Sequence, residues 1–149
     1  MSGPCRVDFY VLEDSAQSAR ALACRLSMMA WEQGHTVMVV TTDEAEANEM
    51  DQFMWNHPPE RFLPHELTES VNAAPICIGT HQQLRPDSAE VIINLTELPI
   101  AQAQRYSRLL ELVPATDSER LASRRKFVAY RNLGLEPQSH AMKSGAETR

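Results

Sequence analysis

The sequence predicts an α/β domain in three layers, with a mostly parallel sheet flanked by helices. Residues 7–12 and 36–40 are short runs rich in β-branched and aromatic side chains, which is typical of buried strands. A segment with helical spacing of its apolar residues follows each run. Because connections of this length allow neighbouring strands to run parallel, the order β-α-β-α indicates a Rossmann-like sheet. The length of 149 residues fits one domain.

The first helix is predicted between the two strands. Asp14 and Ser15 are candidate N-cap residues, and Gly34 is expected to end the helix. Its apolar positions recur at the spacing of one buried helical face: Ala19, Leu22, Ala23, Leu26 and Ala30. The sequence therefore predicts a helix that covers one side of the sheet.

A second helix is predicted after residues 36–40. Asp43 and Glu46 have the spacing of a capping box, and Pro58-Pro59 is expected to end the helix. Beyond it the pattern is less regular. Three further apolar runs predict strands, at residues 75–79, 91–95 and 109–114.

The last helix is predicted from about residue 119 to residue 133. Asp117 or Ser118 would cap it, while Gly134 and Pro137 would close it. A shorter helix is expected at residues 101–108. Residues 138–149 are poor in apolar side chains and are expected to form a C-terminal tail without regular structure. The predicted single domain thus spans residues 1–137.

Charge and cysteine content narrow the protein class. The formal net charge is −6, which disfavours a protein whose whole surface coats nucleic acid. Arg25 and Glu32 interrupt the longest apolar stretch, so a membrane helix is not expected, and the N-terminus lacks the pattern of a signal peptide. The three cysteines are widely spaced, which fits a reducing cytoplasm better than a disulfide framework.

Residue patterns for catalysis, cofactors or metals are missing from this sequence. The predicted turn after the first strand contains Glu13 and Asp14 and no glycine, whereas a bound phosphate needs close backbone approach at a helix N-terminus. The five histidines show no metal-ligand spacing, and no serine lies in a Gly-x-Ser-x-Gly motif. We therefore expect no cofactor, no metal site and no catalytic residue.

One basic stretch stands out from this acidic background. Between residues 105 and 131 there are seven basic and three acidic side chains. Five residues of the predicted last helix fall within a sector of roughly 100°, at about 100° per residue: Arg120, Arg124, Phe127, Val128 and Arg131. Such a face suits a ligand that is both anionic and apolar, for example a peptide ending in a hydrophobic residue with a free carboxylate.

Other interpretations of this face stay open. Phe127 and Leu121 could pack inward while the arginines keep the helix soluble and complement its C-terminal dipole. Direct binding of nucleic acid is a further alternative, although one basic helix is a small electrostatic footprint. A small-nucleotide-binding enzyme on the same Rossmann-like scaffold is the remaining alternative.

Several short motifs resemble the family of the chi subunit of bacterial DNA polymerase III. Their order and spacing from residue 7 to residue 134 carry the resemblance, more than any single motif. The motifs are Phe9-Tyr10, Asp51-x-x-x-Trp55, Phe62-x-Pro64-His65, Pro75-Ile76, Asn94-Leu95, Val113-Pro114 and Ala129-Tyr130-Arg131 followed by Gly134. The resemblance implies a non-catalytic adaptor of the replicative clamp-loader complex, with a nucleotide-binding-like fold and no nucleotide site.

The resemblance also implies partners and a binding site. Chi proteins pair with the psi subunit and bind the acidic C-terminal tail of single-stranded-DNA-binding protein, which ends in phenylalanine. The resemblance implies that the protein contacts DNA only indirectly, through these partners, and that it does not bind a membrane. Carried over to this sequence, the tail site comprises Arg120, Arg124, Phe127 and Val113, with Val128, Arg131, Trp55 and Phe62 as further candidates.

This sequence departs from the family pattern at two of these positions. The family commonly has tyrosine at the position of Phe127 and, in some members, lysine at that of Val128. Both departures remove polar contacts to a tail while keeping an apolar wall. For psi, a patch of apolar residues in the second half is a candidate docking surface: Ile92, Leu98, Ile100, Tyr106 and Leu109.

Overall fold

A parallel sheet organises the chain in the computed structural model, which describes residues 5–13, 18–56, 64–67, 74–84 and 89–142. Within these residues seven strands pair in the order β3-β4-β2-β5-β6-β1-β7, and every pair is parallel. The strands are β1 (Arg6–Leu12), β2 (Val37–Thr41), β3 (His65–Leu67), β4 (Ile76–Thr80), β5 (Val91–Asn94), β6 (Arg108–Val113) and β7 (Gln138–Met142). This confirms the predicted α/β, Rossmann-like class.

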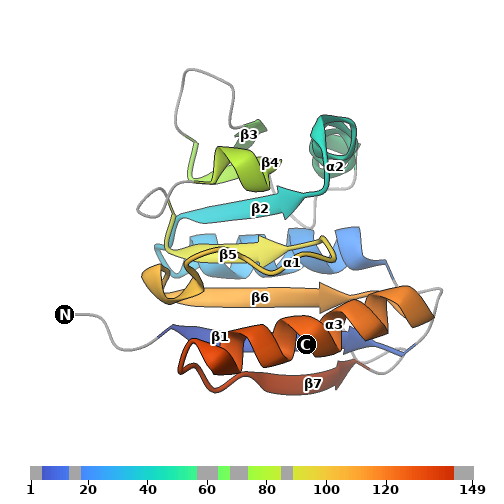
Figure 1. The fold of residues 1–149 in the computed structure, drawn as a ribbon. Helices are drawn as coiled ribbons and strands as arrows, with labels where there is room; N and C mark the ends of the chain where they lie inside the picture. The colour runs from blue at the N-terminus through green and yellow to red at the C-terminus, as the bar shows by residue number, and fades with distance from the viewer. Residues whose placement is uncertain (1–4, 14–17, 57–63, 68–73, 85–88, 143–149) are drawn as a thin grey trace.

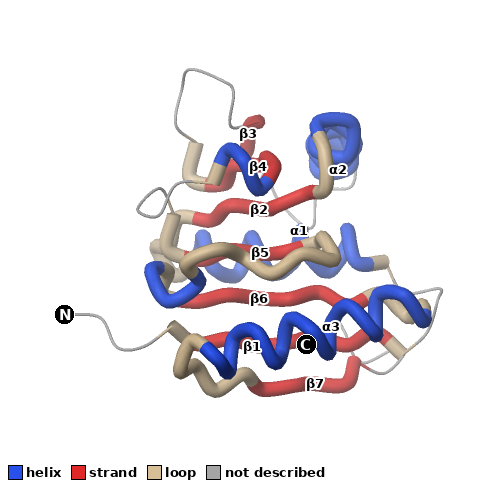
Figure 2. Tube along the Cα trace, viewed as in Figure 1, coloured by secondary structure: helices blue, strands red, loops and turns tan. Residues whose placement is uncertain are grey.

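Helices cover both faces of this sheet (Figure 1). They are α1 (Ala19–Glu32), α2 (Glu44–Asn56) and α3 (Asp117–Asn132). Two 3-10 turns, His81–Gln83 after β4 and Ala103–Arg105 before β6, lie in the loops. Figure 1 shows α3 in front of the sheet and α1 behind it, and Figure 2 shows the red strands enclosed between the blue helices. We call the two faces the α1 side and the α3 side.

Each side of the sheet has its own hydrophobic core. The α1 side buries residues of α1 and α2 against alternate strand residues such as Val39, Ile93 and Leu110. On the α3 side, Phe9 and Tyr130 pack in a second core, which includes Met38, Ile92 and Leu109. All residues of β2 and β5 are buried, as expected for central strands of a parallel sheet with both faces covered.

Helix starts agree with the sequence prediction for α2 and differ for α1. At α2, the Asp43 carboxylate accepts a hydrogen bond from the Glu46 amide at 2.9 Å, while the Glu46 carboxylate accepts one from the Thr42 amide at 3.3 Å. At α1, Ser18 is the cap, since its hydroxyl accepts from the Ala21 amide at 3.1 Å. Asp14 and Ser15, the predicted caps of α1, lie outside the described residues, as does the Pro58-Pro59 stop after α2.

Three further predictions need correction. The expected helix at residues 101–108 is only the 3-10 turn Ala103–Arg105, and strand β3 was not predicted. Residues 138–142, expected in the tail, form β7, because their backbone pairs with β1 from Asp8↔Gln138 to Leu12↔Met142. The rest of the expected tail, residues 143–149, lies outside the described residues. Among the described helices, none is long and apolar enough to cross a membrane.

Candidate functional site

Helix α3 carries the basic face identified in the sequence. Thr116 caps its start by accepting a hydrogen bond from the Glu119 amide at 3.2 Å. Its end is followed by Gly134 at φ +87°, a left-handed conformation that favours glycine after a helix. Ala122, Lys126 and Tyr130 form the buried stripe of this helix. The opposite stripe faces outward and contains the arginines.

Contacts with β1 fix two of the predicted binding residues. The Arg120 guanidinium donates a hydrogen bond to the Leu12 carbonyl at 3.4 Å, at the carboxyl end of β1. Phe127 is half-buried, and its ring centroid lies 5.4 Å from that of Phe9. Both residues therefore lie on the flank of α3 that faces β1.

Around this flank the remaining predicted α3 residues are exposed. Arg124 and Arg131 are exposed, and Val128 is 56% exposed on the same face of the helix. Three arginines, one aromatic and one aliphatic side chain thus share one face of the helix. We call Arg120, Arg124, Phe127, Val128 and Arg131 the α3 face.

Of the three other predicted residues, Val113 and Trp55 do not belong to this surface. Val113 is only 1% exposed, so it supports the α3 side core and does not line an open surface. Trp55 lies on α2, over the α1 side of the sheet, where it is 50% exposed and its ring lies 4.7 Å from the His65 ring. Phe62 lies outside the described residues.

The prediction of an exposed apolar patch for psi is wrong for four of its five residues. Ile92, Ile100, Tyr106 and Leu109 are all buried in the α3 side core, because they face α3 and the loop that packs beside it. Only Leu98 is exposed, at 63%. The four buried residues therefore stabilise the fold and do not form a docking surface.

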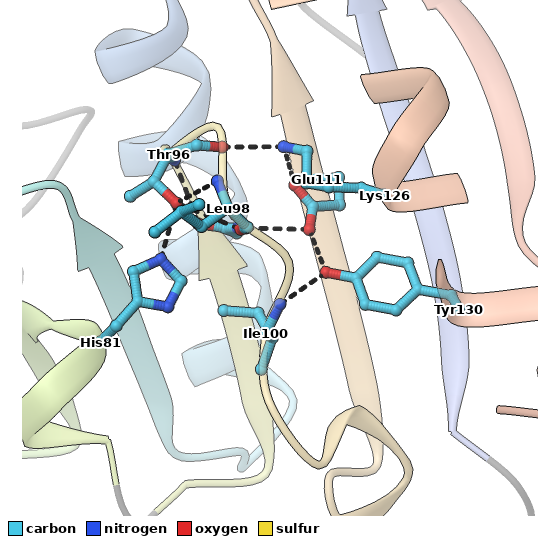
Figure 3. A network of polar contacts seen from close by, with 8 residues as sticks. His81, Thr96, Leu98, Ile100, Glu111, Lys126 and Tyr130 are labelled. Atoms are coloured by element: carbon cyan, nitrogen blue, oxygen red, sulfur yellow. Dashed lines mark hydrogen bonds and ion pairs between the residues drawn. The ribbon is translucent and has the colours of Figure 1, made fainter. Parts of the chain in front are cut away.

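A buried polar network holds α3 against the sheet (Figure 3). The Lys126 ammonium donates to the Glu111 carboxylate at 2.6 Å and to the Thr96 carbonyl at 2.8 Å. The other Glu111 oxygen accepts hydrogen bonds from the Tyr130 hydroxyl at 2.5 Å and from the Asn94 amide at 2.9 Å. Every member of this network lies at the interface between α3, β6 and the residues that follow β5.

Burial controls the ionisation of this network. Burial raises the pKa of Glu111, although Lys126, Tyr130 and Asn94 each act to lower it. Burial also raises the pKa of Tyr130, and the Glu111 charge adds to that shift. Since an unpaired carboxylate in this position would be costly, Lys126 is needed as its counter-ion.

Sequence reasoning missed the network although its pattern was visible. Lys126 is one of the seven basic residues between 105 and 131, yet it is only 1% exposed and cannot contact a ligand. Its spacing from Ala122 and Tyr130 places it on the helix stripe opposite the arginines. Glu111 is likewise the one charged residue in the otherwise apolar run 109–114, which indicates a buried partner.

Metal binding finds no support in the part of the chain that the structure describes, because no group of three or more potential ligands comes together there.

Sequence comparison identifies the family. The family model of the DNA polymerase III chi subunit, HolC, matches residues 5–138. The chain belongs to the DNA polymerase III chi subunit family. DNA polymerase III subunit chi of Pseudomonas aeruginosa is 38% identical to this chi-family chain over 138 residues, covering 92% of this chain and 96% of the relative. The Escherichia coli K12 protein of the same name is 27% identical over 134 residues, covering 85% and 91%.

A solved structure supports the fold of this chi-family chain. The Hef helicase domain of Pyrococcus furiosus superposes with a TM-score of 0.54 at 14% sequence identity. The match covers 91% of this chain but only 35% of the helicase-domain chain. At this identity the likeness concerns the architecture of the sheet and its helices alone. As a chi-family member, the chain is an accessory subunit of the replicative polymerase.

Proposed function

We propose that this chi-family chain is a non-catalytic adaptor that binds the acidic C-terminal tail of single-stranded-DNA-binding protein and pairs with the psi subunit. The observation that carries the tail proposal is the α3 face, where Arg120, Arg124 and Arg131 lie on the same side of the helix as Phe127 and Val128. Family membership supports the pairing with psi. Within the clamp-loader complex, such an adaptor connects the polymerase to protein-coated single strands.

Recognition of the tail uses two kinds of contact. The terminal phenyl ring of the tail packs against the half-buried Phe127 ring and the exposed Val128 side chain. Arg120 and Arg124 bind the carboxylates of the tail, and the hydrogen bond from Arg120 to Leu12 fixes that guanidinium beside β1. Micromolar affinity corresponds to about −8 kcal/mol, which one aromatic contact and a few charge-assisted hydrogen bonds can supply.

The arginines are suited to this task because their charge is not balanced within α3. Of the acidic side chains on α3, Asp117 and Glu119 lie in the first turn, where they complement the helix dipole. Lys126 is neutralised by Glu111, so the arginines supply the outward charge. Their exposure means that salt should weaken tail binding.

A peptide titration tests the tail proposal. We expect an acidic ten-residue peptide ending in phenylalanine to bind with micromolar affinity by fluorescence anisotropy. Arg124→Ala should weaken binding at least tenfold, because it removes a charge-assisted contact. Arg125→Ala is the matched control, since Arg125 is exposed about 100° away around the same helix and should change affinity less than twofold. Amidation of the peptide C-terminus should weaken binding as well.

Two results would overturn the proposal. One is unchanged affinity of a folded Arg124→Ala variant, and the other is an equal loss in Arg125→Ala, which would indicate only general electrostatic attraction. Equilibrium dialysis against ATP and NAD, and titration with a single-stranded oligonucleotide, test the other functional classes. An adaptor of the proposed kind should bind none of these three ligands by itself.

A further inference from the structure

A cleft lies on the opposite face of the molecule from the proposed tail site. It opens on the α1 side of the sheet, at the amino ends of β1, β5 and β6, and has a volume of about 270 Å³. Leu26, Met29 and Ala30 of α1 form one wall. Arg6 and Tyr10 of β1 and Arg108 of β6 form the other. The cleft therefore has an apolar wall and a cationic wall.

A polar cluster beside α1 makes the second wall cationic. The buried Asp8 carboxylate pairs with the Arg6 guanidinium at 3.1 Å and the Arg108 guanidinium at 3.3 Å, both through the same oxygen. Its other oxygen lies 2.8 Å from a ring nitrogen of His140. Arg108 also donates to the Tyr10 hydroxyl at 3.3 Å. Two guanidinium groups thus share one carboxylate.

At the second wall, two guanidinium groups share the single carboxylate of Asp8. Besides Asp8, the C-terminal end of α1 contributes about half a negative charge through its dipole. Glu90, near the rim, pairs with His35 at 3.4 Å and accepts from the Thr36 amide at 3.1 Å. The side chains of Arg6 and Arg108 remain partly exposed, so one further anion can approach them.

We propose that this cleft binds a small carboxylic acid with an apolar body. The carboxylate would meet Arg6 and Arg108, whose fork-shaped guanidinium groups suit a planar anion. The apolar body would lie against Leu26, Met29 and Ala30 of α1. Such a ligand carries a single negative charge and fits a volume of about 270 Å³, below the range of larger drug-sized ligands. This proposal is independent of the tail proposal, because α3 lies on the other side of the sheet.

NMR titration with 3-phenylpropanoate tests the proposal on the whole chain. We expect saturable amide shifts at the residues around the cleft, at 6–10, 26–35 and 107–110, with a dissociation constant on the order of 1 mM. The matched neutral compound 3-phenylpropanol should bind at least fivefold more weakly, since it lacks the charge that the arginines bind.

A pair of variants at the mouth of the cleft provides the matched control. Met29 is 45% exposed, so substitution there leaves the buried core intact. Met29→Glu should weaken 3-phenylpropanoate binding at least fivefold, whereas Met29→Lys should maintain or strengthen it. The proposal is overturned by the absence of saturable shifts around the cleft, by equal binding of the alcohol there, or by equal cleft affinities of the two Met29 variants. Shifts at α3 report on the tail site and are analysed separately. Arg124→Ala on α3 should have no effect.

Discussion

Lys126→Met is the sharpest test of how α3 is held in place. The substitution keeps a long apolar side chain but removes the ammonium group, which makes hydrogen bonds to Glu111 at 2.6 Å and to Thr96 at 2.8 Å. Charge-assisted hydrogen bonds contribute roughly 1.5–3 kcal/mol each, and breaking a buried ion pair typically costs about 3–5 kcal/mol. Because Glu111 can take up a proton in the variant, we expect the lower end of that range, about 3 kcal/mol.

Urea unfolding at pH 7 measures the expected loss in the free energy of unfolding. Arg125→Met, one residue earlier and exposed, is the control and should change stability by less than about 0.5 kcal/mol. Adding Glu111→Gln to Lys126→Met removes the uncompensated charge, so the double variant should recover at least about 1 kcal/mol relative to Lys126→Met alone.

The pH dependence of Lys126→Met follows from the pKa of Glu111. Burial already raises that pKa in the folded state, and loss of the ammonium raises it further. The folded variant then binds more protons than the unfolded chain, so its stability increases as the pH falls from 7 towards the ordinary glutamate pKa. A loss below about 1 kcal/mol at pH 7, or a pH-independent deficit, would refute this account.

Three further substitutions test other parts of the fold by the same unfolding assay. Thr116→Ala should cost about 1 kcal/mol, because it removes the cap that accepts from the Glu119 amide, and an equal stability would argue against that cap. Gly134→Ala should cost about 1–2 kcal/mol from its φ of +87° alone, since nothing lies within 4 Å of the added methyl group. Burial opposes ionisation of Asp8, yet the His140 hydrogen bond and two arginines lower its pKa. Asp8→Asn should therefore be less stable than the parent at pH 7, with a deficit that narrows below about pH 4, and a constant deficit would contradict this.

Local patterns in the sequence were sufficient for most of the fold. The three long helices and strands β1, β2, β4, β5 and β6 follow from apolar periodicity, which reflects burial of one or both faces of each element. Residues 138–142 escaped prediction because Gln138 and Ser139 are polar and exposed. They form a strand through backbone pairing with β1, a long-range contact that leaves no pattern in their own side chains.

The shared face of the candidate residues could be predicted because one helix carries them. Helical geometry alone places Arg120, Arg124 and Phe127 on a common face, and the structure keeps them there. Trp55 could not be placed relative to them from sequence, because strand order decides which helices are neighbours. The partner of Lys126 likewise depends on how α3 crosses β6, so the sequence alone does not show that Lys126 pairs with Glu111.

The position of β1 in the sheet has a consequence for biosynthesis. This first strand is hydrogen-bonded on one edge to β6, beginning at Arg6↔Arg108, and on the other to β7. About a hundred further residues must leave the ribosome before either edge of β1 can find its neighbour, which takes roughly 5–20 s at ordinary translation rates. The nascent chain must therefore carry Val7 and Phe9 unshielded for most of its synthesis, and folding should finish only after the final strand emerges.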